Sequence, residues 1–345
     1  MKIGIQKNIT NLGKGWVKYC EDNEVQYKLI DSYKNDVIQQ LEDCDAFMWN
    51  YNLLQSKDVL NAKPLLLALE HSGKVCFPSI NELWHYDDKL AQKYLLEATD
   101  VPMVPSFVFY DEEIALDWAG NTNYPKVFKL RGGAGSSNVR LVKNEKEAKQ
   151  IIKRAFSKGY PAYSKWRPVR EAFEEMKKGK RSFTSFAKRL YRYFIPVYKG
   201  FIEYKEKDYV YFQEFIANND SDIRLVVVNQ DKIFGLKRFN RKDDFRASGS
   251  GNMKYLTPEL IDEKALKVAL DTAIRLNMDS IAYDIVYDSN RNPLIIEISF
   301  AYTRAAYEKC PGYWDEKLEW HEGIIGNYSG WMVEKIIERI KSINA

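Results

Sequence analysis

Two short runs near the C-terminal end of the sequence constrain the fold more than any other feature. Ile281–Tyr287 and Leu294–Ser299 have the pattern of two strands joined by a polar turn. If the last residue of the first strand faces the first residue of the second, the antiparallel register places Asp284 directly opposite Glu297. Facing carboxylates destabilise a sheet, whereas a divalent cation between them reverses that effect. The pair predicts a metal site rather than a solvated acidic face, because neighbours on the same face are apolar: Ala282, Val286 and Ile295.

A second hairpin is predicted at Tyr124–Val142, where two apolar runs flank a loop of small residues. Glycines in such a loop let backbone N–H groups approach an anion closely, and Lys129 at its base adds a positive charge. The spacing fits neither the P-loop nor the dinucleotide fingerprint, and no helix follows directly. Two interpretations remain, a flap that covers phosphate groups and a mobile turn. The loop residues are Gly132, Gly133, Ala134, Gly135, Ser136 and Ser137.

The composition limits the class of protein. The chain has 345 residues, of which 45% are hydrophobic and 29% charged, so it can form large cores in two or three lobes. No apolar run reaches the length of a membrane-spanning helix, and the first residues lack the apolar stretch of a signal peptide. Four scattered cysteines suit a reducing compartment, so we expect a cytoplasmic protein. Three histidines are too few for a multi-histidine zinc site.

Positive charge is concentrated in one segment. Lys153–Lys199 contains 14 Lys and Arg against 3 Asp and Glu, whereas the whole chain has 52 and 48. Aromatic residues are interleaved with these charges, a mixture that suits an anionic substrate, a phospholipid surface or a nucleic acid. It equally suits an amphipathic insert whose aromatic residues face the protein. Because the rest of the chain is mildly acidic, we do not expect a nucleic-acid-binding protein.

The remaining patterns predict strands alternating with helices, which favours a parallel sheet covered by helices at the N-terminal end. The strands there are expected at Met1–Ile5, Ala46–Trp49 and Val75–Pro78, and the helices at Asn11–Asp22, Asp31–Asp43 and Leu53–Ser72, with a break near Pro64. A capping box of Ser79 and Glu82 opens one further helix, which carries Lys89 and Lys93. Later helices are expected at Glu145–Arg154, Thr257–Asn277 and Trp331–Ile340, and later strands at Val101–Tyr110, Tyr209–Ile216, Asp222–Val228 and Lys232–Arg238.

Taken in order along the chain, these motifs resemble the ATP-grasp superfamily. The set comprises a lysine on a helix, a lysine with a small-residue loop, the strand QEFI, the string DIR with a basic hairpin, DFRASGSGN, and the acidic strand pair. The resemblance extends from Asp87 to Phe300. The strings DIR and DFR are similar to those of glutamate ligases that modify ribosomal protein S6. The long insert and the string CPGYWDEKLEWHEG look more like ATP-grasp proteins associated with bacterial surface-polysaccharide synthesis.

The resemblance implies an α/β fold of the α+β type, in which a parallel α/β lobe precedes two lobes that clasp ATP. The implied bounds are 1–85 for the N-terminal lobe, 86–210 for the small lobe and 211–345 for the C-terminal lobe with the metal site. The basic insert at about 155–200 belongs to the small lobe in this division. Peripheral membrane contact, if the protein makes any, would involve this insert.

The resemblance also implies residue roles. Lys89 and Lys129 would hold the α- and β-phosphates. For Lys89 and Lys93, helical spacing alone favours two solvated lysines on the helix. Cations that would neutralise the transferred phosphoryl group or a substrate carboxylate are Arg224, Arg238 and Arg246. The implied ligands of a Mg²⁺ ion are Asp284, Glu297 and Ser299. The other residues implied in ATP binding are Gly132, Gly133, Gly135, Ser136, Ser137, Glu214, Phe215, Ile216 and Lys237.

Two strings depart from the family's pattern. The pattern ends in an acid, an apolar residue and an asparagine whose amide oxygen is a third metal ligand, whereas this chain has Ser299. A serine hydroxyl can coordinate or hold a water, but it is shorter. Ser248–Asn252 also differs from the arginine-glycine-glycine string of the glutamate ligases, so a glutamate-specific acceptor site is not implied.

These features lead to the hypothesis of an ATP- and Mg²⁺-dependent ligase that joins a small carboxylate to an amine, either sugar-derived or amino-acid-derived, through an acyl phosphate. Surface-polysaccharide modification is the setting that the second resemblance implies. The alternative is a catalytically silent nucleotide-binding protein that regulates or scaffolds glycan assembly. The role of His321 stays open between a base, a substrate contact and a residue that is hydrogen-bonded in place.

Overall fold

The computed structural model describes residues 1–7, 11–53, 55–132, 139–161, 205–241, 244–247 and 251–343, with five single residues between 162 and 204. The predicted loop residues Gly133, Gly135, Ser136 and Ser137 and nearly all of the basic insert therefore lie outside the described residues. Within the described part, no helix combines the length and apolarity needed to cross a membrane.

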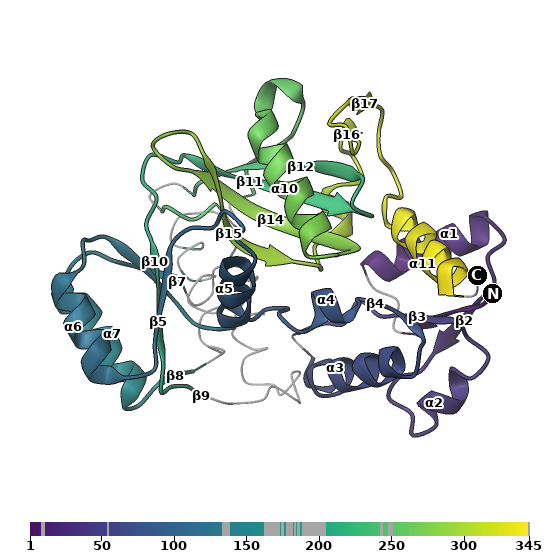
Figure 1. The fold of residues 1–345 in the computed structure, drawn as a ribbon, viewed down its shortest axis with the longest axis horizontal. Helices are drawn as coiled ribbons and strands as arrows, with labels where there is room; N and C mark the ends of the chain where they lie inside the picture. The colour runs from purple at the N-terminus through teal and green to yellow at the C-terminus, as the bar shows by residue number, and fades with distance from the viewer. Residues whose placement is uncertain are drawn as a thin grey trace.

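A parallel four-stranded sheet forms the N-terminal lobe, as the alternating pattern predicts. Its order is β2 (Tyr27–Ile30), β1 (Ile3–Gln6), β3 (Ala46–Met48) and β4 (Val75–Phe77). The helices of this lobe are α1 (Leu12–Asp22), α2 (Val37–Gln40) and α3 (Ser56–His71). The C-terminal helix α11 (Ser329–Ile343) returns to pack beside α1 and β4 (Figure 1).

Three predictions for this lobe are wrong in detail. The strand β2 is missed, although three of its four residues are apolar, and Ile30 is its one fully buried residue. The helix predicted at Asp31–Asp43 is limited to the single turn of α2. Pro64 does not break α3. The proline removes a hydrogen bond to the carbonyl of Leu60, and water can replace it because that turn of the helix is exposed.

The predicted capping box is present, but the helix that it opens is short. In α4 (Ile80–Leu83), Ser79 and Glu82 cap each other's backbone. The chain then reverses through Asp87, which adopts a left-handed φ of 54°, and starts again as α5 (Lys89–Ala98). The side chain of Asp88 accepts hydrogen bonds from the first amides of α5. One predicted helix is therefore two.

A second sheet, antiparallel, contains the hairpin predicted around Lys129. Its order is β5 (Ser106–Phe109), β10 (Val210–Glu214), β6 (Lys126–Lys129) and β7 (Val139–Val142). Two helices, α6 (Glu112–Asn121) and α7 (Glu145–Phe156), share an apolar core with it. The short strands β8 (Tyr160–Pro161) and β9 (Lys205–Glu206) pair where the basic insert leaves and rejoins the lobe.

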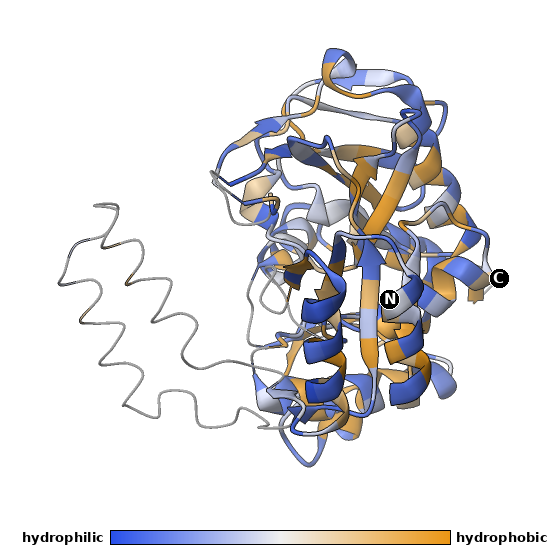
Figure 2. Cartoon of the chain, turned by 90° about the vertical axis from the view of Figure 1, so that its left-hand side faces the viewer, coloured by the Kyte–Doolittle hydropathy of each residue, from blue (hydrophilic) through white to orange (hydrophobic). Residues whose placement is uncertain are grey.

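The third and largest sheet follows from residue 221 onward. Its path is β15 (Pro293–Ser299), β14 (Ser280–Tyr287), β11 (Ser221–Val228), β12 (Lys232–Phe239), β16 (Gly312–Trp314) and β17 (Trp320–Glu322), with β13 (Met253–Tyr255) paired to β12. The helix predicted at Thr257–Asn277 is a 3₁₀ turn (Pro258–Leu260) followed by α10 (Glu263–Arg275). A second 3₁₀ turn spans Arg304–Ala306. Helix α10 covers one face of the sheet. Figure 2 shows apolar residues concentrated in the strands and on one side of the helices.

Asp284 and Glu297 lie opposite each other, as predicted, but β14 and β15 pair in a different register from the predicted one. Tyr287 faces Pro293 rather than Leu294, and a bulge between Asp284 and Ile285 adds one residue to β15. The bulge brings Asp284 opposite Glu297. It also turns Ile295 to the other face, where it packs against α10, so this residue is not a neighbour of the acidic pair as predicted.

Candidate functional site

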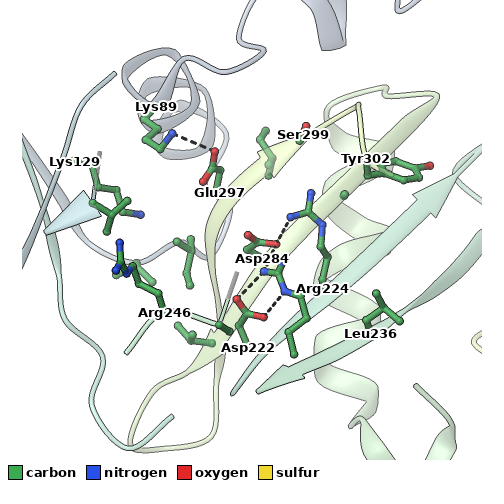
Figure 3. Close-up of a pocket in the computed structure, with 18 of the residues that line it drawn as sticks. Lys89, Lys129, Asp222, Arg224, Leu236, Arg246, Asp284, Glu297, Ser299 and Tyr302 are labelled. Atoms are coloured by element: carbon green, nitrogen blue, oxygen red, sulfur yellow. Dashed lines mark hydrogen bonds and ion pairs between the residues drawn. The ribbon is translucent and has the colours of Figure 1, made fainter. Parts of the chain in front are cut away.

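A cavity of about 480 Å³ lies between the second sheet and the face of the third sheet that α10 leaves uncovered. Residues from all three lobes line it, and the close-up in Figure 3 shows charged side chains converging there from both sides. The predicted site residues that line the cavity are Lys89, Lys129, Glu214, Phe215, Ile216, Arg224, Arg238, Arg246, Asp284, Glu297 and Ser299.

Two arginines hold Asp284. The Oδ1 atom of Asp284 accepts a hydrogen bond from Arg224 Nη1 at 3.0 Å and lies 2.9 Å from Arg238 Nη2. Arg238 also makes a two-pronged contact with Asp222, with both N–O distances 2.7 Å. Burial favours the neutral acid, but the two guanidinium groups outweigh it and lower the pKa of Asp284. Asp284 is therefore a carboxylate whose charge is already balanced.

The order of the strands explains this cluster. In the ladders of the third sheet, Arg224 on β11 is directly opposite Asp284 on β14, and Asp222 on β11 is directly opposite Arg238 on β12. All four side chains lie on the cavity face. Residues that alternate with them along β11 and β14, such as Ile223 and Tyr283, pack toward α10. The sheet thus presents a row of alternating charges, and opposite charges across strands stabilise one another.

Two lysines face this row from the other side of the cavity (Figure 3). Lys89, at the start of α5, places its Nζ atom 3.2 Å from Glu297 Oε1. Lys129, at the end of β6, donates to Gln213 Oε1 at 2.5 Å. Burial opposes the charge on both lysines, yet Glu297 and Asp87 raise the pKa of Lys89. For Lys129 the effect of burial exceeds that of the nearby carboxylates and lowers the pKa to about 8. Both lysines are buried. The alternative interpretation of Lys89 as a solvated lysine on its helix is therefore wrong.

One end of the cavity is an apolar slot with a polar rim. Glu214 lies at its edge, where it accepts from Lys126 Nζ at 2.6 Å, and its amide donates to the carbonyl of Pro105. A slot of this kind suits a flat ring with polar atoms along one edge. Its apolar walls are Val104, Val127, Phe215, Ile216 and Ile296. Lys126 and Gln213 support the site although neither was predicted. Their signal was present, because both are polar residues in otherwise apolar strands.

The opposite end is lined by tyrosines and arginines. Tyr302 and Tyr307 follow β15, and Tyr86 and Leu53 come from the segments around the first lobe. Asn11, at the start of α1, fixes this wall, since it donates to the carbonyl of Tyr302 and accepts from the amide of Arg304, each at 2.6 Å. No motif in the sequence marks these residues, because an irregular loop brings them to the cavity.

Several predicted residues lie elsewhere. Lys237 does not line the cavity, because it alternates away from Arg238 and extends over the ring of Phe239. His321 stacks on Tyr313 at 4.9 Å and contacts Asp315 at 2.8 Å on the exposed β17, so it is held in place far along the sheet from the cavity. Gly132 is the last described residue before 139 and is not among the lining residues.

The oxygen donors for a metal ion are few. Asp284 and Glu297 face each other, while the hydroxyl of Ser299 donates to the carbonyl of Ala301 at 2.8 Å. Within the described ranges, no group of three or more acidic, histidine or cysteine residues is arranged to hold a metal. An ion placed here would need further oxygen ligands from water or from a bound anion.

Comparison with known proteins gives matches along most of the chain. The RimK-like ATP-grasp domain model matches residues 199–312, and the model of the ATP-binding domain of the carbamoyl-phosphate synthase L chain matches residues 88–173. The α-aminoadipate–LysW ligase LysX of Saccharolobus solfataricus is 23% identical over 229 residues. That alignment covers 66% of this chain and 66% of the relative, so the chain spans about two thirds of the length of the curated relative that it matches.

Solved structures share the fold over nearly the full length. The D-alanine–D-alanine ligase of Bacillus anthracis in complex with ATP superposes with a TM-score of 0.57 at 12% identity and covers 99% of each chain. The ATP-grasp ligase PsnB, complexed with a minimal precursor, Mg and ADP, gives a TM-score of 0.54 at 12% identity, with 99% of this chain and 98% of that chain covered. The two domain matches and the shared architecture agree with the order of motifs in the sequence. The chain is a member of the ATP-grasp superfamily.

Proposed function

We propose that the protein is an ATP-dependent ligase that joins a carboxylate to an amine through an acyl phosphate and releases ADP and phosphate. One observation carries this proposal: Lys89 and Lys129 face Asp284 and Glu297 across a single cavity (Figure 3). Such a cavity offers cations to a polyphosphate and carboxylates to the metal ion that accompanies it.

The nucleotide would lie with its base in the apolar slot and its phosphates between the two lysines. Glu214 and the backbone at Phe215 and Ile216 border the slot and would meet the polar edge of adenine. Lys129, fixed by Gln213, and Lys89, fixed by Glu297, would contact the phosphates. Because these lysines are buried, they hold their positions before the nucleotide arrives, which reduces the cost of ordering them.

The donor chemistry fits Mg²⁺, which prefers carboxylate, phosphate and water oxygens. Asp284 and Glu297 would hold the ion, and Ser299 would reach it only through water while it remains bonded to Ala301. When bound, Mg²⁺ neutralises charge on the phosphoryl oxygens that it contacts.

The chain's own part in the reaction is positioning and charge stabilisation. An oxygen of the substrate carboxylate bonds to the γ-phosphorus as the bond to ADP breaks. The amine nitrogen then bonds to the acyl carbon as phosphate leaves, and the amine loses one proton. Arg224, Arg238 and Arg246 line the cavity in which these groups would meet, and their planar donors suit carboxylate and phosphoryl oxygens.

The substrates would enter at the tyrosine-lined end. A wall made of Tyr86, Tyr302 and Tyr307 suits a sugar-linked or amino-acid-derived group better than a long aliphatic chain. The proposed setting, modification of a surface polysaccharide, rests on the resemblance of the string CPGYWDEKLEWHEG, which forms β16 and β17. A substrate panel should therefore contain sugar acids and amino sugars beside amino acids.

The proposed function is tested by release of ADP and phosphate from ATP and Mg²⁺ in the presence of paired carboxylates and amines. A ligase releases both products only when a carboxylate is supplied, and forms an amide when an amine is added. ATP turnover that ignores every carboxylate in the panel would count against the proposal.

A catalytically silent nucleotide-binding protein is the second candidate, and one observation favours it. The charge of Asp284 is already balanced by two arginines, and Ser299 is bonded to its own turn. This candidate predicts nucleotide binding of ordinary strength with no product release from any substrate pair.

A further inference from the structure

We propose that Arg224 and Arg238 stand in for a second metal ion, so that the protein binds its nucleotide with a single divalent cation on the Glu297 side of Asp284. The inference rests on the proposed function, because it concerns the same nucleotide site. A polyphosphate site with two facing carboxylates has ligands for either one ion or two. The charges around the carboxylates decide between these numbers.

Asp284 has little capacity left for metals. Its Oδ1 atom is shared by Arg224 at 3.0 Å and Arg238 at 2.9 Å, so at most its second oxygen can reach an ion. Both guanidinium groups are mostly buried, with side-chain exposures of 20% and 13%. A second cation at this carboxylate would therefore approach two positive charges that solvent screens poorly.

The arginines are held where they are. Arg238 binds both oxygens of Asp222, whose own burial raises its pKa, so moving Arg238 away would leave Asp222 buried without its partner. Arg224 is directly opposite Asp284 in the β11–β14 ladder, and the backbone of a central strand fixes that position. The two charges are thus part of the sheet and not mobile side chains at its rim.

Ser299 adds little to a second ion site. Its hydroxyl donates to the carbonyl of Ala301 and accepts from the amide of the same residue at 3.3 Å. Glu297 differs from both residues, because its counter-ion Lys89 comes from α5 and faces the phosphate side of the cavity. A phosphate can replace Glu297 as the partner of Lys89, which releases Glu297 to bind one ion.

Native mass spectrometry of the full chain with ADP and Mn²⁺ tests this inference, since each retained ion adds its own mass to the ADP complex. We expect one Mn²⁺ per ADP-bound chain in the wild type. The double variant Arg224→Gln/Ser299→Asn removes one competing charge and adds an amide oxygen, and we expect it to retain two. Arg291→Gln, which removes an exposed charge from the turn of the same hairpin, should retain one.

The outcomes separate this inference from the proposed function. Two Mn²⁺ ions in the wild-type ADP complex would overturn the inference and leave the nucleotide site intact, whether or not the double variant folds. A folded double variant that still retains one ion would show that Arg224 does not stand in for a metal. Failure of the wild type to retain ADP with Mn²⁺ would contradict the proposed nucleotide function itself, and the inference with it.

Discussion

The Nζ atom of Lys89 on α5 lies 3.2 Å from Oε1 of Glu297 on β15. This ion pair joins the first helix after the N-terminal lobe to the second strand of the acidic pair. Each residue is the other's counter-ion, and both line the cavity. The proposed function gives each a stronger partner, a phosphate for the lysine and a metal ion for the carboxylate. We therefore expect the nucleotide and the metal to bind cooperatively, since each releases a residue that the other needs.

Lys129→Ala should lower ATP turnover on the order of 10²–10³-fold, because it removes a preorganised cation from the phosphates. Product release in the substrate panel measures this effect. Lys237→Ala is the matched control, since Lys237 is a lysine on β12 of the third sheet that does not line the cavity. The assignment of Lys129 would be wrong if its variant kept wild-type turnover, or if both variants lost turnover equally.

The affinity for ADP should fall as the pH rises above about 8. Burial lowers the pKa of Lys129 to about 8, so above that pH the lysine in the free protein is neutral and must take up a proton to pair with a phosphate. Calorimetry should show a loss of up to about tenfold per pH unit above this value. Lys129→Arg keeps its charge and should show a flatter profile. An affinity of the wild type that does not change between neutral pH and pH 9 would contradict the role of Lys129.

Glu82 should make the protein less stable as the pH rises from mildly acidic to alkaline values. This residue is fully buried between Ser79 and Asp279, and burial raises its pKa to about 8 from the usual 4.5 although both neighbours donate to it. The folded state then binds the proton more tightly than the unfolded chain. The free energy of unfolding therefore falls over this range, by at most about 1.4 kcal/mol per pH unit.

The measurement is urea unfolding of the wild type and Glu82→Gln at several pH values. The stability of the variant relative to the wild type should improve as the pH rises, because the amide carries no proton to lose. Glu42→Gln, at an exposed position, should show no such trend. A constant difference between wild type and Glu82→Gln would mean that Glu82 is ionised throughout in the folded protein.

Gly15→Ala should destabilise the packing of α1 against α11. A Cβ atom at this position would lie 1.8 Å from Ser329 Oγ and 2.3 Å from Asn327 Oδ1, so neighbouring groups must move. We expect a loss of about 1–3 kcal/mol in the free energy of unfolding, although alanine favours a helix interior over glycine. Denaturant unfolding measures the change, with the exposed Lys14→Ala as control. A gain in stability would show that helix propensity outweighs the close contact.

The sequence predicts most of this architecture because its signals are local. The capping box at Ser79, the hairpin around Lys129 and the facing acids each depend on residues within one short stretch of the sequence. The bulge beside Asp284 is not visible in the pattern, because an extra residue in one strand leaves its composition unchanged. It moves Ile295 to the other face while it preserves the predicted acidic pair.

The electrostatics of the site could not be predicted, because they depend on which strands are neighbours. Arg224 reaches Asp284 only because β11 lies beside β14, and the two residues are 60 positions apart in the chain. The DIR string and the acidic strand can each be recognised in the sequence, but no pattern indicates that the two strands lie side by side. Tyr302 and Tyr307 were missed for a similar reason, since a loop without periodicity carries them to the cavity.

The most direct test of the account is calorimetric titration of the protein with a non-hydrolysable ATP analogue, with Mg²⁺ and with a chelator. We expect one nucleotide per chain, bound much more weakly without the metal, and we expect Glu297→Gln to abolish the difference between the two conditions. Equal affinity with and without Mg²⁺ in the wild type, or a metal effect that survives in Glu297→Gln, would contradict the claim that the facing acids bind a metal-linked triphosphate.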